Sequence, residues 1–273
     1  MVKYLYLGSI NFPARGGGGY MIYVTGDTHG DFRRFSTDIF PEQKEMTKED
    51  FVIICGDFGG IWCQEDNRKA MKNENYWLDW LDQKPFTTLF VCGNHENFDR
   101  LSTFPVENRY GGNVHVIRPS ILHLMRGEIF RIDGSSVFAF GGASSHDISD
   151  GILQKENWKE EAKKLDRRGK YMYRIDGLSW WKEELPSDKE MQNGLSNLAK
   201  TGNRVDYIIT HSPPASIIAL LGFGAYNQDI LTEYLEDIRC TIDYNYWFMG
   251  HMHMNRRFTK QDFLLYEQIV RVV

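Results

Sequence analysis

Five short segments of this sequence end in side chains that commonly bind metal ions. Four combine glycine with Asp, Asn or His, and the fifth is a Thr-His pair. In chain order they are Gly26-Asp27-Thr28-His29-Gly30, Gly56-Asp57, Gly93-Asn94-His95-Glu96, Thr210-His211 and Gly250-His251-Met252-His253. Asp, Asn and His suit Mn²⁺, Fe, Zn²⁺, Co²⁺ or Ni²⁺, and no cysteine cluster offers a site for a softer ion. A metal centre is therefore the first chemistry that the sequence predicts.

Each segment follows an apolar run that is typical of a β-strand. These runs are 21–25, 51–55, 87–92, 205–209 and 246–249. Ligands of α/β folds gather beyond the carboxyl ends of the strands, so segments that are distant in the sequence can converge there. Glycine lets the chain turn sharply after a strand without a Cβ penalty. The pattern predicts that the five segments meet at one edge of the fold.

Seven side chains are candidates for metal ligands: Asp27, His29, Asp57, Asn94, His211, His251 and His253. One catalytic zinc typically takes three protein ligands, so this set suits two ions that share a carboxylate. Such pairs lie about 3.5–4 Å apart and hydrolyse phosphate esters. Any one segment is explained equally well as a turn or a cap, and Asp31 is expected to be only a cap. The five together favour the metal centre.

The elements between these segments predict a mixed α/β fold. Strands alternate with helices at 31–40 and 64–82, which predicts parallel pairing. Further strands are expected at 114–117, 121–125, 128–132 and 136–140, with a hairpin at Asp133-Gly134. A helix is expected at 227–239, with Ile230, Leu231, Tyr234, Leu235 and Ile238 inward, and antiparallel strands at 256–259 and 263–273. Together they predict a four-layer αββα sandwich, two mixed β-sheets flanked by helices.

One domain over 21–273 is expected from the length. Residues 1–20 are predicted to be a leader or a cloning remnant that ends in a glycine linker. A polar helical insert is predicted at about 144–203, with a capping box at Ser187-Asp188-Lys189-Glu190. Its part 154–174 carries eight basic side chains against four acidic ones, with Trp158, Tyr171 and Tyr173 between them. A solvated helix whose aromatic side chains pack on the body is favoured; the alternative is a cap that grips phosphate or stacks a nucleobase.

The composition limits the partners. A formal net charge of −5 argues against a dedicated nucleic-acid binder, whereas a small phosphorylated substrate fits because metal ions supply positive charge. Four cysteines without C-x-x-C spacing predict reduced thiols in a cytoplasmic protein, and Cys55 and Cys92 are expected to be buried. No apolar stretch approaches the roughly 18 residues of a membrane helix. No obligate protein partner is inferred.

The five segments, in this order, resemble the signature of the calcineurin-like metallophosphoesterase family from about Met21 to the end of the chain. The resemblance implies a four-layer sandwich and two divalent metal ions, Mn²⁺ in first place. It implies that one ion is held by Asp27, His29 and His253. It implies that the other is held by Asn94, His211 and His251, with Asp57 bridging both. His95 would face the leaving oxygen as general acid or charge stabiliser, while a bridging hydroxide attacks phosphorus in line.

The sequence departs from the family pattern after the second segment. Members that dephosphorylate proteins carry Asp-Arg-Gly there, and the arginine grips phosphate. Here Asp57 is followed by Phe58-Gly59-Gly60-Ile61-Trp62, so a phosphomonoester or phosphodiester is expected rather than a folded protein. Any phosphate-binding arginine must come from elsewhere in the chain.

Two alternatives stay open beside the small-substrate phosphoesterase. One is a nuclease or nucleotide phosphodiesterase that uses the basic and aromatic insert, and the other is a non-catalytic scaffold of the same fold. Three residues are further candidates for substrate contact: His146, Phe223 and Tyr226. For His146 a plain loop is the favoured interpretation. His115 and His123, inside predicted antiparallel strands, are expected to be structural.

Overall fold

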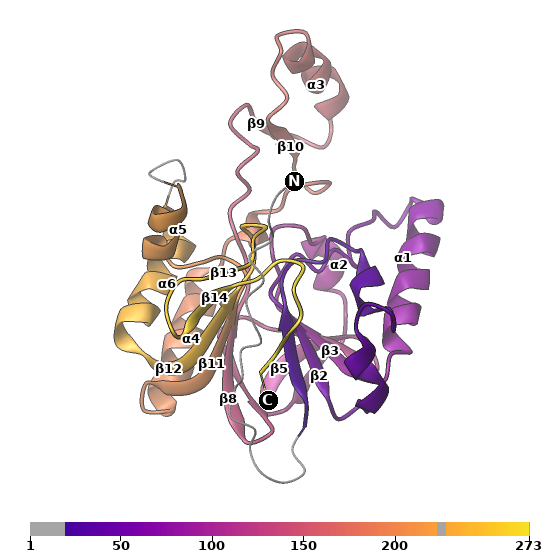
Figure 1. Cartoon of the computed structure of the whole chain (residues 1–273). Coiled ribbons are helices and arrows are strands. Elements are labelled where there is room, and N and C mark those ends of the chain that lie inside the picture. Colours follow the sequence, from indigo (N-terminus) through magenta and orange to yellow (C-terminus); the bar gives the residue numbers. More distant parts are fainter. Residues whose placement is uncertain (1–19, 223–227, 273) are drawn as a thin grey trace, which may run out of the picture.

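Two β-sheets face each other at the centre of the molecule, and helices cover their outer faces. A computed structural model describes residues 20–222 and 228–272, and Figure 1 shows the arrangement. The predicted leader therefore lies, apart from Tyr20, outside the described residues. One apolar cluster fills the space between the sheets, and two others lie between each sheet and its helices. The predicted four-layer sandwich is confirmed.

The first sheet has the strand order β15-β1-β2-β3-β6-β5-β4. Its strands are β1 (Ile22–Thr25), β2 (Phe51–Ile54), β3 (Thr87–Phe90), β4 (Val106–Arg109), β5 (Gly112–Arg118), β6 (Ile121–Leu124) and β15 (Val270–Arg271). β1, β2 and β3 are parallel neighbours, as the alternation with helices predicted. Along β2, Ile53 faces the other sheet while Val52 and Ile54 face the helices. Both faces are buried, which explains the continuous apolar runs in the sequence.

The second sheet has the order β13-β14-β12-β11-β8-β7. Its strands are β7 (Glu128–Ile132), β8 (Ser135–Phe140), β11 (Arg204–Thr210), β12 (Asp243–Met249), β13 (Arg256–Arg257) and β14 (Asp262–Leu264). β8, β11, β12 and β14 are parallel neighbours. The predicted hairpin joins β7 to β8, and Asp133 and Gly134 both have positive φ, as a type I′ turn requires.

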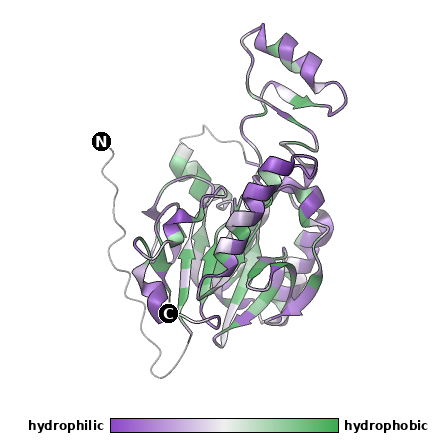
Figure 2. Cartoon of the chain, turned by 90° about the vertical axis from the view of Figure 1, so that its right-hand side faces the viewer, coloured by the Kyte–Doolittle hydropathy of each residue, from purple (hydrophilic) through white to green (hydrophobic). Residues whose placement is uncertain are grey.

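Helices cover the outer faces of both sheets (Figures 1 and 2). The first sheet carries 3-10 helices η1 (Phe32–Phe35) and η2 (Pro41–Glu45) with α1 (Arg68–Asp82) and α2 (Phe98–Leu101); the second carries α4 (Asp188–Lys200), α5 (Ala215–Gly222) and α6 (Ile230–Thr241). The capping box of Ser187 and Glu190 is confirmed at the start of α4. Among the described residues, no helix is both long and apolar enough to cross a membrane.

Three predicted elements were wrong in detail. The helix expected at 31–40 is a single 3-10 turn, which Asp31 caps and which ends where Ser36 becomes extended. Ile230, expected to face inward, is 47% exposed at the first position of α6, whereas Leu231 beside it is buried. The closing strand expected at 263–273 is two strands: β14 joins the second sheet beside β12, and β15 joins the first sheet beside β1. The chain therefore crosses from one sheet to the other.

A small subdomain projects from one end of the sandwich (Figure 1). It contains β9 (Gly151–Leu153), α3 (Trp158–Asp166) and β10 (Tyr173–Ile175), and η3 (Lys182–Glu184) follows at its base. β9 and β10 pair in parallel as a separate two-stranded sheet, so the segment predicted as helical also holds strands. Of the three aromatic side chains predicted to pack on the body, Tyr171 is 69% exposed, and Trp158 and Tyr173 are half-buried. The favoured packing on the body is therefore wrong for Tyr171. We call residues 151–175 the projection.

Candidate metal centre

The five segments meet where the carboxyl ends of the two sheets come together. The first sheet brings the residues after β1, β2 and β3, and the second brings those after β11 and β12. Backbone hydrogen bonds tie the segments to one another: His29 N–H donates to Asp57 O at 2.8 Å, and Gly250 N–H donates to His211 O at 3.0 Å. The convergence predicted for the strand ends is therefore present.

One group of ligand atoms is open to solvent. Asp27, His29, Asp57 and His253 each place a ligand atom within 4.8 Å of the others. His253 Nε2 lies 3.2 Å from Asp27 Oδ2 and 2.9 Å from His29 Nε2. The hydrogen bond from His253 to Asp27 raises the pKa of His253, although burial opposes it. Two imidazole nitrogens at this distance share either a proton or a cation.

A second group lies deeper and shares Asp57 with the first. Asp57, His211 and His251 place their ligand atoms within 4.8 Å of one another, and His211 Nε2 is 3.3 Å from Asp57 Oδ1. Burial opposes protonation of His211, but Asp57 and Asp27 outweigh it and raise its pKa to about 10. Burial lowers the pKa of His251 to about 3. The pair of carboxylates thus draws positive charge into a buried site.

Unpaired polar atoms test whether metal ions fit here. His211 Nδ1 donates to Cys55 O at 2.8 Å, and Nε2 has no hydrogen-bond partner. A cation that replaces the proton on Nε2 would therefore meet a free lone pair. Asn94 Oδ1 is also buried without a partner, and buried Asp27 Oδ2 has only its contact with His253. A metal-binding histidine commonly donates its other N–H to a carbonyl in this way, and unpaired buried acceptors are costly unless a cation satisfies them. The donor set fits two divalent cations.

The backbone around the ligands is strained. Seven non-glycine residues of the described chain have positive φ, and four of them are predicted ligands: His29, Asp57, His251 and His253. Such conformations cost of order 1–3 kcal/mol each and persist where the surroundings impose them, often at functional sites.

The close approach of the segments also leaves no room for side chains at the glycines. A Cβ on Gly250 would lie 2.3 Å from Asp27 Oδ1.

Gly93→Ala tests this crowding directly. A Cβ on Gly93 would lie 2.0 Å from Asp57 Oδ1, so alanine must displace the shared carboxylate. We expect a destabilisation of about 1–3 kcal/mol and metal content below that of wild type, measured by calorimetry and elemental analysis. Gly202→Ala is the control, because Gly202 has positive φ but open space around it. If both variants keep the same metal content, crowding does not position Asp57.

His95 lies beside the two groups but belongs to neither. Its backbone N–H donates to Asp57 Oδ1 at 2.9 Å, and its ring stands edge-on to His29 with centroids 5.0 Å apart. Its Nε2 lies 3.2 Å from Nη2 of Arg174. Because a guanidinium has no acceptor, Nε2 accepts this hydrogen bond and the ring is neutral. Burial and then the Arg174 charge lower the pKa of His95 to about 4, against the opposite effect of Asp57.

For two residues at the site the sequence predicted no individual role. Arg174 comes from β10, and its sequence gives no signal because β10 reaches the site only through its pairing with β9. Glu96 ends the third segment: its carboxylate accepts hydrogen bonds from Phe58 N and Gly93 N, both at 2.7 Å. It thereby fastens the turn after β2 to the turn after β3. An acidic residue at the end of a predicted ligand segment was the signal in the sequence that could have identified it.

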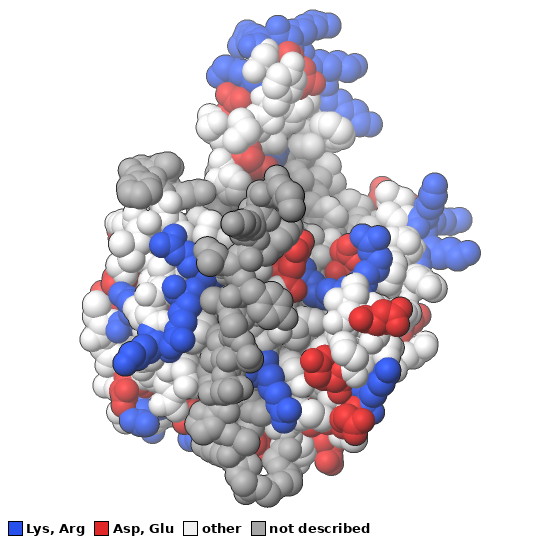
Figure 3. Space-filling view, in the orientation of Figure 1, with Lys and Arg blue, Asp and Glu red and all other residues white. Residues whose placement is uncertain are grey.

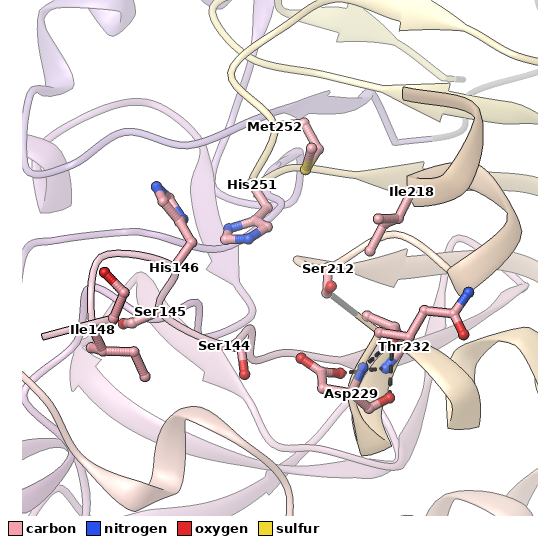
Figure 4. Close-up of a pocket in the computed structure, with 12 residues that line it drawn as sticks. Ser144, Ser145, His146, Ile148, Ser212, Ile218, Asp229, Thr232, His251 and Met252 are labelled. Atoms are coloured by element: carbon pink, nitrogen blue, oxygen red, sulfur yellow. Dashed lines mark hydrogen bonds between the residues drawn. The ribbon is translucent and has the colours of Figure 1, made fainter. Parts of the chain in front are cut away.

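A cavity of about 410 Å³ opens beside His251, and Figure 4 shows the residues that line it. His146 forms part of its wall, with its ring centroid 6.1 Å from that of His251. The geometry therefore favours the alternative to a plain loop, in which the loop brings His146 towards the site. Asp229 and Thr232, at the start of α6, line the opposite side. Phe223 and Tyr226 lie outside the described residues.

The other two histidines, His115 and His123, and two of the cysteines behave as structural residues. His115 Nδ1 and His123 Nδ1 are 2.9 Å apart across β5 and β6, away from the ligand groups. Cys55 and Cys92 are buried, as predicted, and burial raises the pKa of Cys92 to about 12.

The fold and this site define the class of the protein. The calcineurin-like phosphoesterase family matches residues 20–255, so the chain belongs to that family. The family comprises hydrolases of phosphate ester bonds, and its members use a dinuclear divalent metal centre. The prediction of the family from the five segments is confirmed.

The curated relatives to which this chain is similar include lariat debranching enzymes. The chain is 24% identical to lariat debranching enzyme A of Xenopus laevis over 258 residues, which is 85% of this chain and 42% of the relative. It is 24% identical to lariat debranching enzyme of Danio rerio over 255 residues, 85% of this chain and 40% of the relative. The enzyme of Arabidopsis thaliana is 32% identical over 100 residues, 33% of this chain and 23% of the relative. The chain spans about two fifths of the length of the first two relatives.

Proposed function

We propose that this chain is a metal-dependent phosphodiesterase that cleaves a nucleic-acid strand. The observation that carries the proposal is the pair of ligand groups that share Asp57. A shared carboxylate sets two cations close enough to act on one phosphate, which a single-ion site does not do. Manganese is the ion we expect first, because the oxygen and nitrogen donors suit it.

Different residues of the chain would hold the ions and serve the leaving oxygen. Asp27, His29 and His253 would hold one ion, Asn94, His211 and His251 the other, and Asp57 both. The ions would supply Lewis acidity and lower the pKa of a water nucleophile. His95, next to the ligands and neutral, would serve the leaving oxygen. The two ligand groups differ in access, since His29 and His253 of the first group are exposed, whereas no member of the second group is exposed.

The projection supports a nucleic-acid substrate in spite of the net charge of −5. Seven of the eight basic side chains in 154–174 are exposed on it, and Figure 3 shows Lys and Arg gathered there. A local basic surface attracts a phosphate backbone even when the whole protein is acidic. The relatives' name, lariat debranching enzyme, points to the same class of substrate. A role as a non-catalytic scaffold is less well supported, because every predicted ligand is present.

The decisive assay compares ester classes on protein reconstituted with Mn²⁺. The substrates are a linear RNA strand, an RNA with a 2′,5′ branch, a bis-aryl phosphate and a nucleoside monophosphate. We expect the diesters to be cleaved and the monophosphate to be cleaved at least tenfold more slowly. The opposite order would make the chain a phosphomonoesterase. No turnover by protein that holds two metal ions would support the scaffold instead.

Removing charge from the projection tests the substrate separately. In a variant with Lys163, Lys164, Arg167 and Arg168 all changed to Ala, we expect a higher KM for an RNA strand and unchanged cleavage of the bis-aryl phosphate. The salt dependence of log KM should weaken by about 0.7 for each RNA phosphate that the variant no longer neutralises. A control variant, Lys44→Ala, removes one charge from the sandwich at an exposed residue of η2. Equal KM values for RNA in wild type and the fourfold variant would contradict a strand on the projection.

A further inference from the structure

We propose that Arg174 binds the phosphate of the substrate and so replaces the arginine that is missing after Asp57. The inference rests on the proposed function, because it assigns a contact within the same site. Arg174 is the one basic residue of 154–174 that is buried rather than exposed. It leaves the projection at β10 and reaches the candidate metal centre, where its Nη2 lies 3.2 Å from His95 Nε2.

The hydrogen bonds of the guanidinium leave one donor unused. Its Nε–H donates to Asp147 Oδ1 at 2.6 Å. Its Nη1 donates to Ser179 O at 3.1 Å and to Asn94 O at 3.5 Å. Its Nη2 donates once, to His95, and a guanidinium carries five N–H groups. The fifth N–H, on the edge that faces His95, has no partner among the described residues.

A second buried arginine shows what a purely structural role looks like in this chain. Arg126 Nε donates to Gly141 O, and its Nη1 donates to Leu185 O and the Glu190 carboxylate. Its Nη2 donates to Glu183 O and Glu184 O. All five donors of Arg126 are therefore spent on the protein. Arg174 differs because its Nη2 edge contacts only a side chain of the reaction site.

Neighbouring carboxylates hold Arg174 in place. Asp147 comes from the loop after β8, and Glu184 Oε1 lies 3.7 Å from Nη1. Glu184 is itself fixed, since its Oε2 accepts hydrogen bonds from Ser145 N and Ser145 Oγ at 3.1 and 2.6 Å. A preorganised guanidinium can donate its free Nη2–H to a phosphate oxygen without a large loss of side-chain entropy. Asp147 is accordingly a positioning residue for Arg174.

The test measures binding of inorganic phosphate to the Mn²⁺-loaded protein by calorimetry, which requires no turnover. For Arg174→Met we expect the Kd for phosphate to rise about 10- to 100-fold, the value of a hydrogen bond to a charged group. Arg174→Lys should lie between, because it keeps the charge and loses the fork. Asp147→Asn should weaken phosphate binding less than Arg174→Met. Arg109→Met is the control, since Arg109 is exposed on β4 and forms its ion pair with Glu107.

Each outcome decides for or against Arg174. An unchanged Kd in Arg174→Met, with native metal content and Tm, overturns the inference, and so does wild-type loaded protein that does not bind phosphate. If Arg174→Met does not fold, Arg174→Lys decides: weaker phosphate binding at native Tm supports the contact, and unchanged binding refutes it. Failure of the proposed function is distinguishable, because it appears as intact phosphate binding without diester cleavage.

Discussion

Asp57→Asn is expected to abolish diester cleavage and to lower the metal content below two ions per chain. Asparagine keeps the shape and one oxygen that can accept from Asn94 N and His95 N, both at 2.9 Å in the wild type. It removes the negative charge that both ligand groups share. We expect kcat to fall about 10³-fold, which corresponds to about 4 kcal/mol of transition-state stabilisation from the metal pair. Steady-state kinetics and elemental analysis of the same sample measure both effects.

Asp31→Asn is the matched control for Asp57→Asn. Asp31 lies two residues beyond His29 in the same loop but caps η1 and contacts Arg33, and asparagine also caps helices. We expect this variant to keep two ions and wild-type kcat. Two bound ions and unchanged turnover in Asp57→Asn would remove the bridging role. A comparable loss in both variants would point to damage of the loop rather than to the shared carboxylate.

The parts of the fold that follow from periodicity were predictable. Buried strands read as unbroken apolar runs, and an Asp-Gly pair between two such runs specifies a hairpin by its positive φ values. The exchange between sheets at the end of the chain was not predictable, because Phe263 and Val270 are equally apolar and only tertiary pairing assigns them to different sheets. The turn at Phe32–Phe35 also depends on context, since Asp31 starts it and Ser36 ends it within four residues.

The candidate ligand residues of the site were visible in the sequence because each belongs to a segment that follows a strand. Their partners were not. Arg174 is separated from His95 by 79 positions and reaches it only because β10 pairs with β9 and turns inward. Its sequence neighbours Lys170 and Tyr171 are exposed, so the local pattern indicated a solvated segment. The composition of a basic segment does not show that one of its residues is buried and contacts the site.

His95→Ala is expected to lower kcat about 10²- to 10⁴-fold, the range of general acid–base catalysis. His95 belongs to neither ligand group, so the variant should keep two metal ions, unlike Asp57→Asn. The loss should depend on the leaving group. It should be small for a bis-aryl phosphate, whose phenolate departs without help, and large for an RNA strand, whose sugar oxygen must gain a proton.

The contact with Arg174 makes this dependence informative. In the structure His95 Nε2 accepts from Arg174, so the neutral ring offers no proton from that nitrogen. A leaving-group effect in His95→Ala would mean that His95 gains a proton once the substrate phosphate accepts the Nη2 hydrogen bond that His95 accepts in the structure. An equal loss for both substrates would instead mean that His95 stabilises charge or orients Arg174. His95→Gln then separates these two, because glutamine can still accept from Arg174 and should recover activity only if orientation is the role.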